Sequence, residues 1–209
     1  MGETLNREKL FAGCEELAER DQDLAFVYSS FGLPPLWLRE ATFATLLHII
    51  LEQQVSLASA RSAFNKLSEK LDGEITPENV LALSDAEMKA AYFSRQKTVY
   101  ARDLAAKIGA GKLDLEGLKN LPDEQVKIEL KQVKGIGEWT AGIYLLMALM
   151  RPDVMPKGDL ALHVAWQKLK KLDTRPNADE FLEIAERWKP FRAVAARLLW
   201  HFYLSVKKV

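Results

Sequence analysis

Residues 133–141 decide the fold and read Val133-Lys134-Gly135-Ile136-Gly137-Glu138-Trp139-Thr140-Ala141. Apolar residues recur at helical spacing before this stretch and again after it, through Met150. Its two glycines allow positive φ and close backbone approach, and the second helix begins with unpaired N–H groups. We therefore expect a helix-hairpin-helix whose amides bind a phosphate. Taken alone, Gly-x-Gly is more commonly just a sharp interhelical turn.

The residues around the hairpin favour the phosphate interpretation. Lys131 and Lys134 flank the turn, and such contacts hold a DNA backbone without reading its sequence. A single acid, Asp159, follows at the start of the next helical pattern. Its ordinary role there is an N-cap. The functional alternative is a carboxylate facing a cleft in which a sugar develops positive charge.

The rest of the chain predicts an all-α fold, because apolar residues recur at helical spacing almost throughout and strand-like alternation is absent. We expect one domain, 1–209, made of two helical lobes that flank a cleft. The lobes are residues 42–151, with the hairpin, and 1–41 plus 152–209. The expected helices are Arg7 to Tyr28, Thr42 to Lys70, short helices within 77–110, and Pro122 to Gln132.

Charge, cysteine and histidine content and the length of apolar runs bear on which classes of protein the chain can belong to. Lys and Arg balance Asp and Glu at 29 each, which counts against a nucleic-acid binder, although residues 1–30 carry seven acids against three bases and leave the remainder positive. Lone Cys14 excludes an internal disulfide, and three scattered histidines lack zinc-ligand spacing. Met1 to Leu10 is no signal peptide, and no apolar run reaches about 18 residues. We expect no membrane association and a cytoplasmic monomer, nucleoid-associated if bacterial and nuclear if eukaryotic.

Several motifs in order resemble one family. The hairpin, Ile50 to Ser56, Tyr92 to Lys97 and Arg187 to Pro190 are similar to the helix-hairpin-helix (HhH-GPD) DNA glycosylase superfamily, and closest to its AlkA-like 3-methyladenine DNA glycosylases. The resemblance covers about residue 30 to the end. It implies a monofunctional glycosylase that flips out alkylated purines of the 3-methyladenine and 7-methylguanine type. Base excision repair of double-stranded DNA containing damaged bases would be its role.

The resemblance also implies site residues. The family's catalytic Asp falls on Asp159, and Gly135 and Gly137, beside Lys134, fall where the DNA phosphate binds. Gln54 falls where relatives insert a side chain into the duplex, although an exposed Gln needs no such role.

The implied base pocket is lined by Trp139, Trp200 and Ile143. Tryptophans at helical spacing are usually core, and that interpretation stands for Trp166 and Trp188.

No cofactor is implied for the reaction. Backbone carbonyls of Lys131, Val133 and Ile136 match positions that often hold a structural monovalent cation, Na⁺ or K⁺. Bifunctional relatives carry a Schiff-base lysine where this chain has Trp139. The resemblance therefore implies water as the nucleophile and no strand-cleaving lyase activity.

The chain departs from the family pattern in ways that leave alternatives open. Lys134 replaces a common Pro, and Ile143 replaces a pocket tyrosine. At 209 residues the chain is too short for an extra N-terminal β domain, and it lacks the four cysteines of the iron–sulfur branch. The alternatives are a glycosylase for a deaminated or oxidised base, a non-enzymatic helix-hairpin-helix DNA-binding protein, and a helical protein unrelated to nucleic acid.

Overall fold

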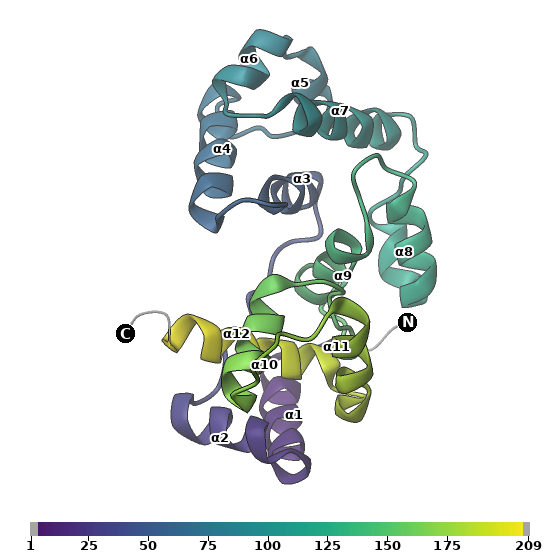
Figure 1. Ribbon diagram of the computed structural model, residues 1–209. Coiled ribbons are helices and arrows are strands. Elements are labelled where there is room, and N and C mark those ends of the chain that lie inside the picture. Colours follow the sequence, from purple (N-terminus) through teal and green to yellow (C-terminus); the bar gives the residue numbers. More distant parts are fainter. Residues whose placement is uncertain (1–3, 207–209) are drawn as a thin grey trace. The chain divides into compact units, whose positions relative to one another are not determined.

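The computed structural model describes residues 4–206, and these residues form helices and connecting turns without a β-strand (Figure 1). This confirms the predicted all-α class. The chain divides into two compact units. Arg39–Tyr144 make the first unit, and residues 4–38 with 145–206 make the second. No helix within residues 4–206 combines the length and apolarity needed to cross a membrane.

The first unit is built around α3, whose Leu46, Leu47 and Ile50 are fully buried. In this unit α3 packs against α4 and α7, and α7 packs against α5 (Figure 1). Its helices are α3 Phe43–Glu52, α4 Leu57–Lys70, α5 Pro77–Ala82, α6 Asp85–Ala90, α7 Arg95–Gly109, the 3₁₀ turn Gly117–Asn120, α8 Asp123–Lys131 and the start of α9 Glu138–Met147. The predicted short helices of 77–110 are present, but α7 extends over 15 residues.

Hydroxyl side chains define where the helices of this unit begin. Ser56, Thr76, Ser84 and Ser94 each accept a hydrogen bond from the backbone N–H three residues later. Each cap satisfies one of the N–H groups that a helix start leaves unpaired.

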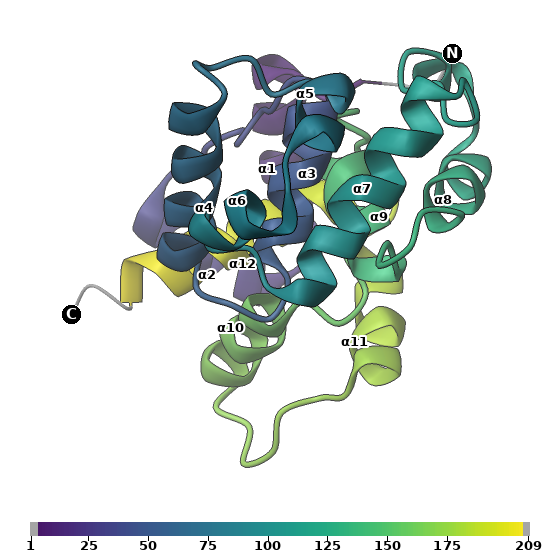
Figure 2. The same ribbon diagram turned by 90° about the horizontal axis from the view of Figure 1, so that it is seen from above.

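The second unit is built around α12, which lies against α1, α2 and α10 (Figure 1). Its helices are α1 Arg7–Arg20, α2 Gln22–Phe31, α10 Leu160–Lys170, α11 Ala178–Ala185, the 3₁₀ turn Glu186–Trp188 and α12 Arg192–Val206. Between α10 and α11 the chain makes a long excursion (Figure 2). Trp166 and Trp188 are buried in this unit, as predicted.

A buried arginine joins three segments of the second unit. Arg197 on α12 is fully buried and donates to the carbonyl oxygens of Leu36 (2.9 Å), Ala193 (3.0 Å) and Leu146 (2.8 Å). Burial lowers the pKa of Arg197 to about 10. Because these carbonyls satisfy its donors, the guanidinium can be retained in the core, where it fixes the segment before α3 to α12.

The single helix expected from Arg7 to Tyr28 is wrong, because the chain breaks at Asp21. The Asp21 carboxylate caps α2 by accepting the N–H groups of Asp23 and Leu24. It also accepts the indole N–H of Trp188 at 2.8 Å. Because the Asp21 carboxylate bonds to the start of α2 and to Trp188, α1 ends at Arg20 and a second helix begins at Gln22.

The single helix expected from Thr42 to Lys70 is also wrong. It is interrupted between Glu52 and Leu57, where Gln54 adopts a left-handed conformation with φ +57°. Ser56 then caps α4. Residues 53–56 therefore form a loop where one continuous helix was expected. The loop contains Gln54, the residue predicted to insert into the duplex, and Gln54 is exposed.

Candidate functional site

The hairpin between α8 and α9 depends on one glycine for its conformation. Gly135 has φ +83°, and a Cβ there would lie 2.2 to 2.4 Å from ring carbons of Tyr100. Gly137 is different: its φ is not in the left-handed region, and an added Cβ would meet nothing within 4 Å. Of the two properties that the glycines allow, Gly135 therefore shows the positive φ and Gly137 does not. Gly137 instead leaves open space beside the backbone.

Two polar side chains hold the hairpin backbone in place. Asp103 on α7 accepts the Lys134 N–H and the Lys107 ammonium, both at 2.8 Å. Partial burial acts to raise the pKa of Asp103, but these two hydrogen bonds outweigh it and lower the pKa. The Lys134 amide is thus committed to Asp103, which leaves its exposed side chain as the group that can meet a phosphate.

Gln53, at the end of α3, makes the second anchor. Its side-chain amide donates to the carbonyl oxygen of Gly135 and to the hydroxyl of Thr140, each at 2.8 Å. Neither Gln53 nor Asp103 was predicted. Gln53 stands within the family-like 50–56 stretch, whereas nothing in the sequence around Asp103 indicates its contact with residue 134.

The pocket residues predicted for the first unit differ in exposure. Trp139, near the start of α9, is half-buried, whereas Ile143 is buried. Tyr144 follows, and its buried hydroxyl has no hydrogen-bond partner within residues 4–206. Burial raises the pKa of Tyr144. A tyrosine is thus present one position after the residue that replaces the family's pocket tyrosine.

Gln54 is exposed at the tip of the loop between α3 and α4. The loop is braced by Lys97 on α7, whose ammonium donates to the Leu51 carbonyl at 2.5 Å and so satisfies a carbonyl in the last turn of α3. Burial lowers the pKa of Lys97. An exposed side chain on a braced loop is suited to pushing into a duplex.

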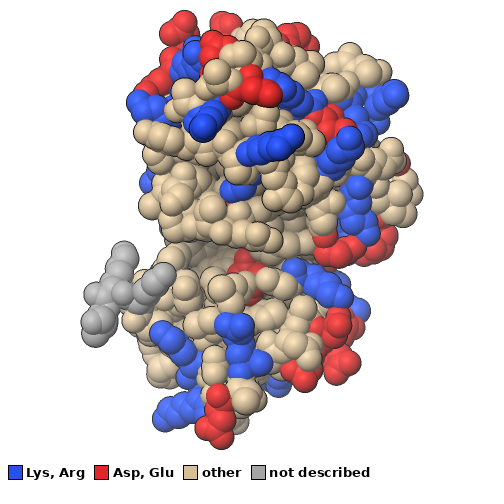
Figure 3. All heavy atoms as spheres, turned by 45° about the horizontal axis from the view of Figure 1, so that its top comes forward, with Lys and Arg blue, Asp and Glu red and all other residues tan. Residues whose placement is uncertain are grey.

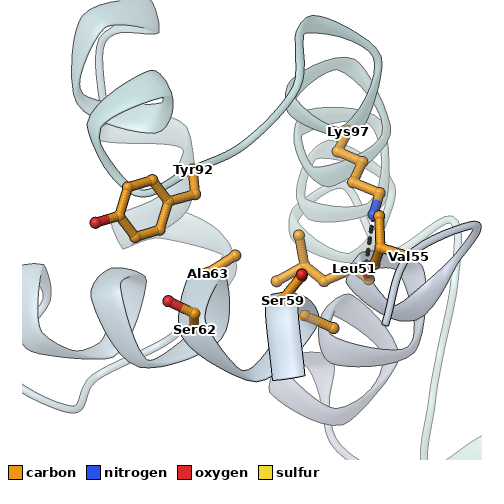
Figure 4. Close-up of a pocket in the computed structure, with 8 residues that line it drawn as sticks. Leu51, Val55, Ser59, Ser62, Ala63, Tyr92 and Lys97 are labelled. Atoms are coloured by element: carbon orange, nitrogen blue, oxygen red, sulfur yellow. Dashed lines mark hydrogen bonds between the residues drawn. The ribbon is translucent and has the colours of Figure 1, made fainter. Parts of the chain in front are cut away.

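A pocket of about 320 Å³ lies beside this loop (Figure 4). Lys97 reaches towards the end of α3 on one side, and Tyr92 lies over the α4 residues Ser62 and Ala63 on the other (Figure 4). Leu51 and Val55 add apolar walls.

In the second unit, Asp159 is the N-cap of α10, as its sequence position predicts. Its Oδ1 accepts two hydrogen bonds, from the Leu162 backbone N–H and from the Trp200 indole N–H, both at 3.1 Å. Asp159 and Trp200 are each only 8% exposed. The two N–H donors hold this oxygen in a fixed position at the start of α10. The structure therefore brings together the predicted catalytic acid and one predicted pocket aromatic.

His163 lies one turn further along α10 and packs on Phe181, with ring centroids 4.7 Å apart. Burial lowers the pKa of His163; the Asp159 carboxylate opposes that effect and Arg175 adds to it. Its ring also has a hydrogen bond with the Pro176 carbonyl, which likewise favours the charged form. Its Nε2 is buried with no partner in the described part of the chain.

Trp37 is a further aromatic of the second unit that the sequence did not indicate. It lies in the segment before α3 with φ +48°, and its ring meets Trp200 edge to face, with centroids 6.0 Å apart and planes at 82°. It follows Pro-Pro-Leu outside any helical pattern, so periodicity carries no signal for it.

Charged side chains of both signs stand on the face drawn in Figure 3. Its Lys and Arg side chains are spread over the surface, several of them beside Asp or Glu, and form no single continuous positive patch. Isolated positive side chains of this kind can each meet a backbone phosphate.

Comparison with known proteins supports the motif analysis. Residues 47–190 match the family model described as HhH-GPD superfamily base excision DNA repair protein. DNA-3-methyladenine glycosylase 1 of Schizosaccharomyces pombe is 30% identical over 165 residues, which cover 78% of this chain and 72% of the relative. The putative DNA-3-methyladenine glycosylase YfjP of Bacillus subtilis is 28% identical, over 85% of this chain and 64% of the relative.

A solved structure agrees with the fold. The S. pombe 3-methyladenine DNA glycosylase in complex with abasic DNA superposes with a TM-score of 0.84 at 25% identity, covering 94% of this chain and 97% of that chain. The family model spans more than half of the sequence, from within α3 to the turn before α12. The chain therefore belongs to the HhH-GPD superfamily of base excision DNA repair proteins.

Proposed function

We propose that the protein is a DNA glycosylase that hydrolyses the bond between an alkylated purine and its sugar, with Asp159 as the catalytic carboxylate. One observation carries the proposal: Asp159 is nearly buried, and its Oδ1 is held by the Leu162 N–H and the Trp200 indole N–H. A carboxylate with a fixed oxygen beside a tryptophan suits both the sugar and the base of one nucleotide.

The reaction begins with the base leaving the stack, because its bond to the sugar is inaccessible within a duplex. Rotating a nucleotide out costs a few kcal/mol, and least for weakened pairs. Gln54 on its braced loop would fill the space that the nucleotide leaves. Gly137, with open space around it, would let a phosphate approach the hairpin backbone.

The bond then breaks with positive charge developing on the sugar. A carboxylate about 4 Å away stabilises that charge by about 4 kcal/mol at an effective dielectric constant of about 20. This is about a thousandfold in rate. The same carboxylate would orient or deprotonate the attacking water, and Trp139 in place of a Schiff-base lysine supports hydrolysis without strand cleavage.

Alkylated purines are the proposed substrates because the relatives named above are 3-methyladenine glycosylases and because indole rings attract cations. A purine alkylated at a ring nitrogen is cationic and leaves more readily. Trp200, which is bonded to Asp159, would attract it by about 0.5 to 2 kcal/mol.

The test compares wild type with Asp159→Asn on methylated duplex DNA, with released 3-methyladenine and 7-methylguanine measured by chromatography. Wild type should release both bases and leave the strand unbroken before alkali. The variant should lose about a thousandfold in single-turnover rate and still bind DNA. Near-normal release by the variant would contradict the role of Asp159. Binding without release by either protein would identify a non-enzymatic DNA-binding protein.

A structural Na⁺ or K⁺ at the hairpin remains part of the proposal. The Val133 carbonyl accepts the Ile136 N–H at 3.1 Å, which leaves its second lone pair for a cation. Carbonyls of Lys131 and Ile136 would complete the protein ligands, and oxygen donors suit such hard cations. Melting in NaCl, KCl and choline chloride at equal ionic strength tests this: equal midpoints would contradict it.

A further inference from the structure

Trp37 is linked to the candidate catalytic carboxylate through one intermediate side chain. Its ring meets the Trp200 ring edge to face at 6.0 Å between centroids, and the Trp200 indole N–H donates to Asp159 at 3.1 Å. All three residues belong to the second unit. Trp37 therefore contacts the side chain that hydrogen-bonds the candidate catalytic carboxylate.

The backbone of Trp37 is strained and firmly held. Its φ of +48° is a conformation that a bulky L-residue rarely adopts. Arg197 donates to the carbonyl of Leu36, which belongs to the peptide that leads into Trp37. Arg197 and Trp200 are three residues apart on α12 and thus share a face of that helix. One helix therefore fixes both the position of Trp37 and the ring that it meets, and strain maintained in this way is characteristic of ligand sites.

Exposure distinguishes Trp37 from the core tryptophans of the same unit. Trp166 and Trp188 are buried, whereas Trp37 is half-buried and its neighbour Leu38 is 65% exposed. A ring that served only the core would not require a strained backbone to remain partly open to solvent. Trp37 thus keeps solvent-accessible surface that the core tryptophans lack.

From this geometry we infer that Trp37 is a specificity-determining residue: its indole contacts the flipped base together with Trp200 and favours cationic purines. The inference rests on the proposed glycosylase function. Tryptophan has the strongest attraction for a cation among the aromatic side chains, so its replacement should matter most for an alkylated, positively charged base. An abasic site has no base for Trp37 to contact, so the affinity for a duplex with an abasic site should not depend on Trp37.

The test uses Trp37→Phe and Trp37→Leu. Both variants keep a Cβ, so the positive φ at residue 37 is about as unfavourable in the variants as in the wild type. The rate of single-turnover release of 7-methylguanine from a defined duplex should decrease in the order Trp, Phe, Leu. The Leu variant should be slower than wild type by about two- to thirtyfold, with about tenfold as the central value. Affinity for the same duplex carrying an abasic site should stay within about twofold. Phe26→Leu is the matched control, since Phe26 is an exposed aromatic of the same unit with an edge contact to Phe31.

Three outcomes would overturn the inference. Unchanged release by Trp37→Leu would show that the indole does not contact the base. Equal losses in release, abasic affinity and melting midpoint would show that Trp37 only supports the fold. An equal loss in Phe26→Leu would show an unspecific effect. Absence of release by wild type itself would instead reject the glycosylase function on which the inference rests.

Discussion

Trp200 and Asp159 meet through a single hydrogen bond, from the indole Nε1 to Oδ1 at 3.1 Å, and that oxygen also accepts the Leu162 N–H. Both donors therefore fix one oxygen of the carboxylate. The N-cap role of Asp159 and its proposed catalytic role are compatible, because the cap defines the orientation in which the carboxylate is presented.

Trp200→Phe separates the ring of Trp200 from its N–H. The variant keeps an aromatic wall but removes one donor to a buried carboxylate, which is worth about 1.5 to 3 kcal/mol. We expect a lower melting midpoint and a single-turnover rate at least about tenfold lower. Affinity for an abasic duplex provides the control and should be unchanged. A rate equal to that of wild type would show that the indole N–H does not position Asp159.

The two hairpin glycines should respond in opposite ways to alanine. Gly135→Ala combines an unfavourable φ with a clash against Tyr100, and should destabilise the protein by about 2 to 4 kcal/mol. Gly137→Ala should change stability by less than about 0.5 kcal/mol, since open space surrounds the position. If a phosphate approaches there, the same variant should lose DNA affinity. Urea unfolding and duplex titration measure the two effects, and full DNA affinity in Gly137→Ala would reject the phosphate site.

Asp103→Ala should loosen the hairpin from α7. It leaves the Lys134 N–H and the Lys107 ammonium without their shared acceptor, and a loss of about 1 to 3 kcal/mol is expected with weaker DNA binding. Asp85→Ala is the control, because the Asp85–Arg102 pair is exposed and such pairs contribute about 0 to 1 kcal/mol. Equal effects in the two variants would contradict an anchoring role for Asp103.

Acid should destabilise the second unit through His163. Burial lowers its pKa in the folded protein, so between pH 6.5 and that lowered value the unfolded chain binds more protons. Stability therefore falls as pH decreases through this window, by up to about 1.4 kcal/mol per pH unit. His163→Gln should flatten the dependence of unfolding free energy on pH. His48, whose pKa burial also lowers, should account for part of the remaining slope. An unchanged slope in His163→Gln would contradict the assignment.

Local sequence rules predicted much of the fold. The cap at Asp159 was readable because a capping side chain bonds to its own helix. Asp21 was missed, since its decisive partner, Trp188, lies 167 residues away. The interruption at Gln54 was missed for a similar reason: Lys97, from another helix, supports the end of α3.

Residues of the candidate site were likewise predictable where they stand in a local motif and not where they depend on distant contacts. Gly135, Gly137 and Asp159 stand in motifs, so the sequence indicated them. Trp37 and Asp103 act through contacts with residues far along the chain, and no local pattern marks them.

Arg197 gives the second unit an unusual property. Its guanidinium donates to the carbonyl of Leu36, the residue before Trp37, and the Trp37 ring meets Trp200 on the same helix as Arg197. The contact inferred between Trp37 and a flipped base would thus depend on a side chain that is itself fully buried. A substitution of Arg197 should therefore lower the stability of the second unit and, if the inference about Trp37 holds, also weaken the preference for cationic bases.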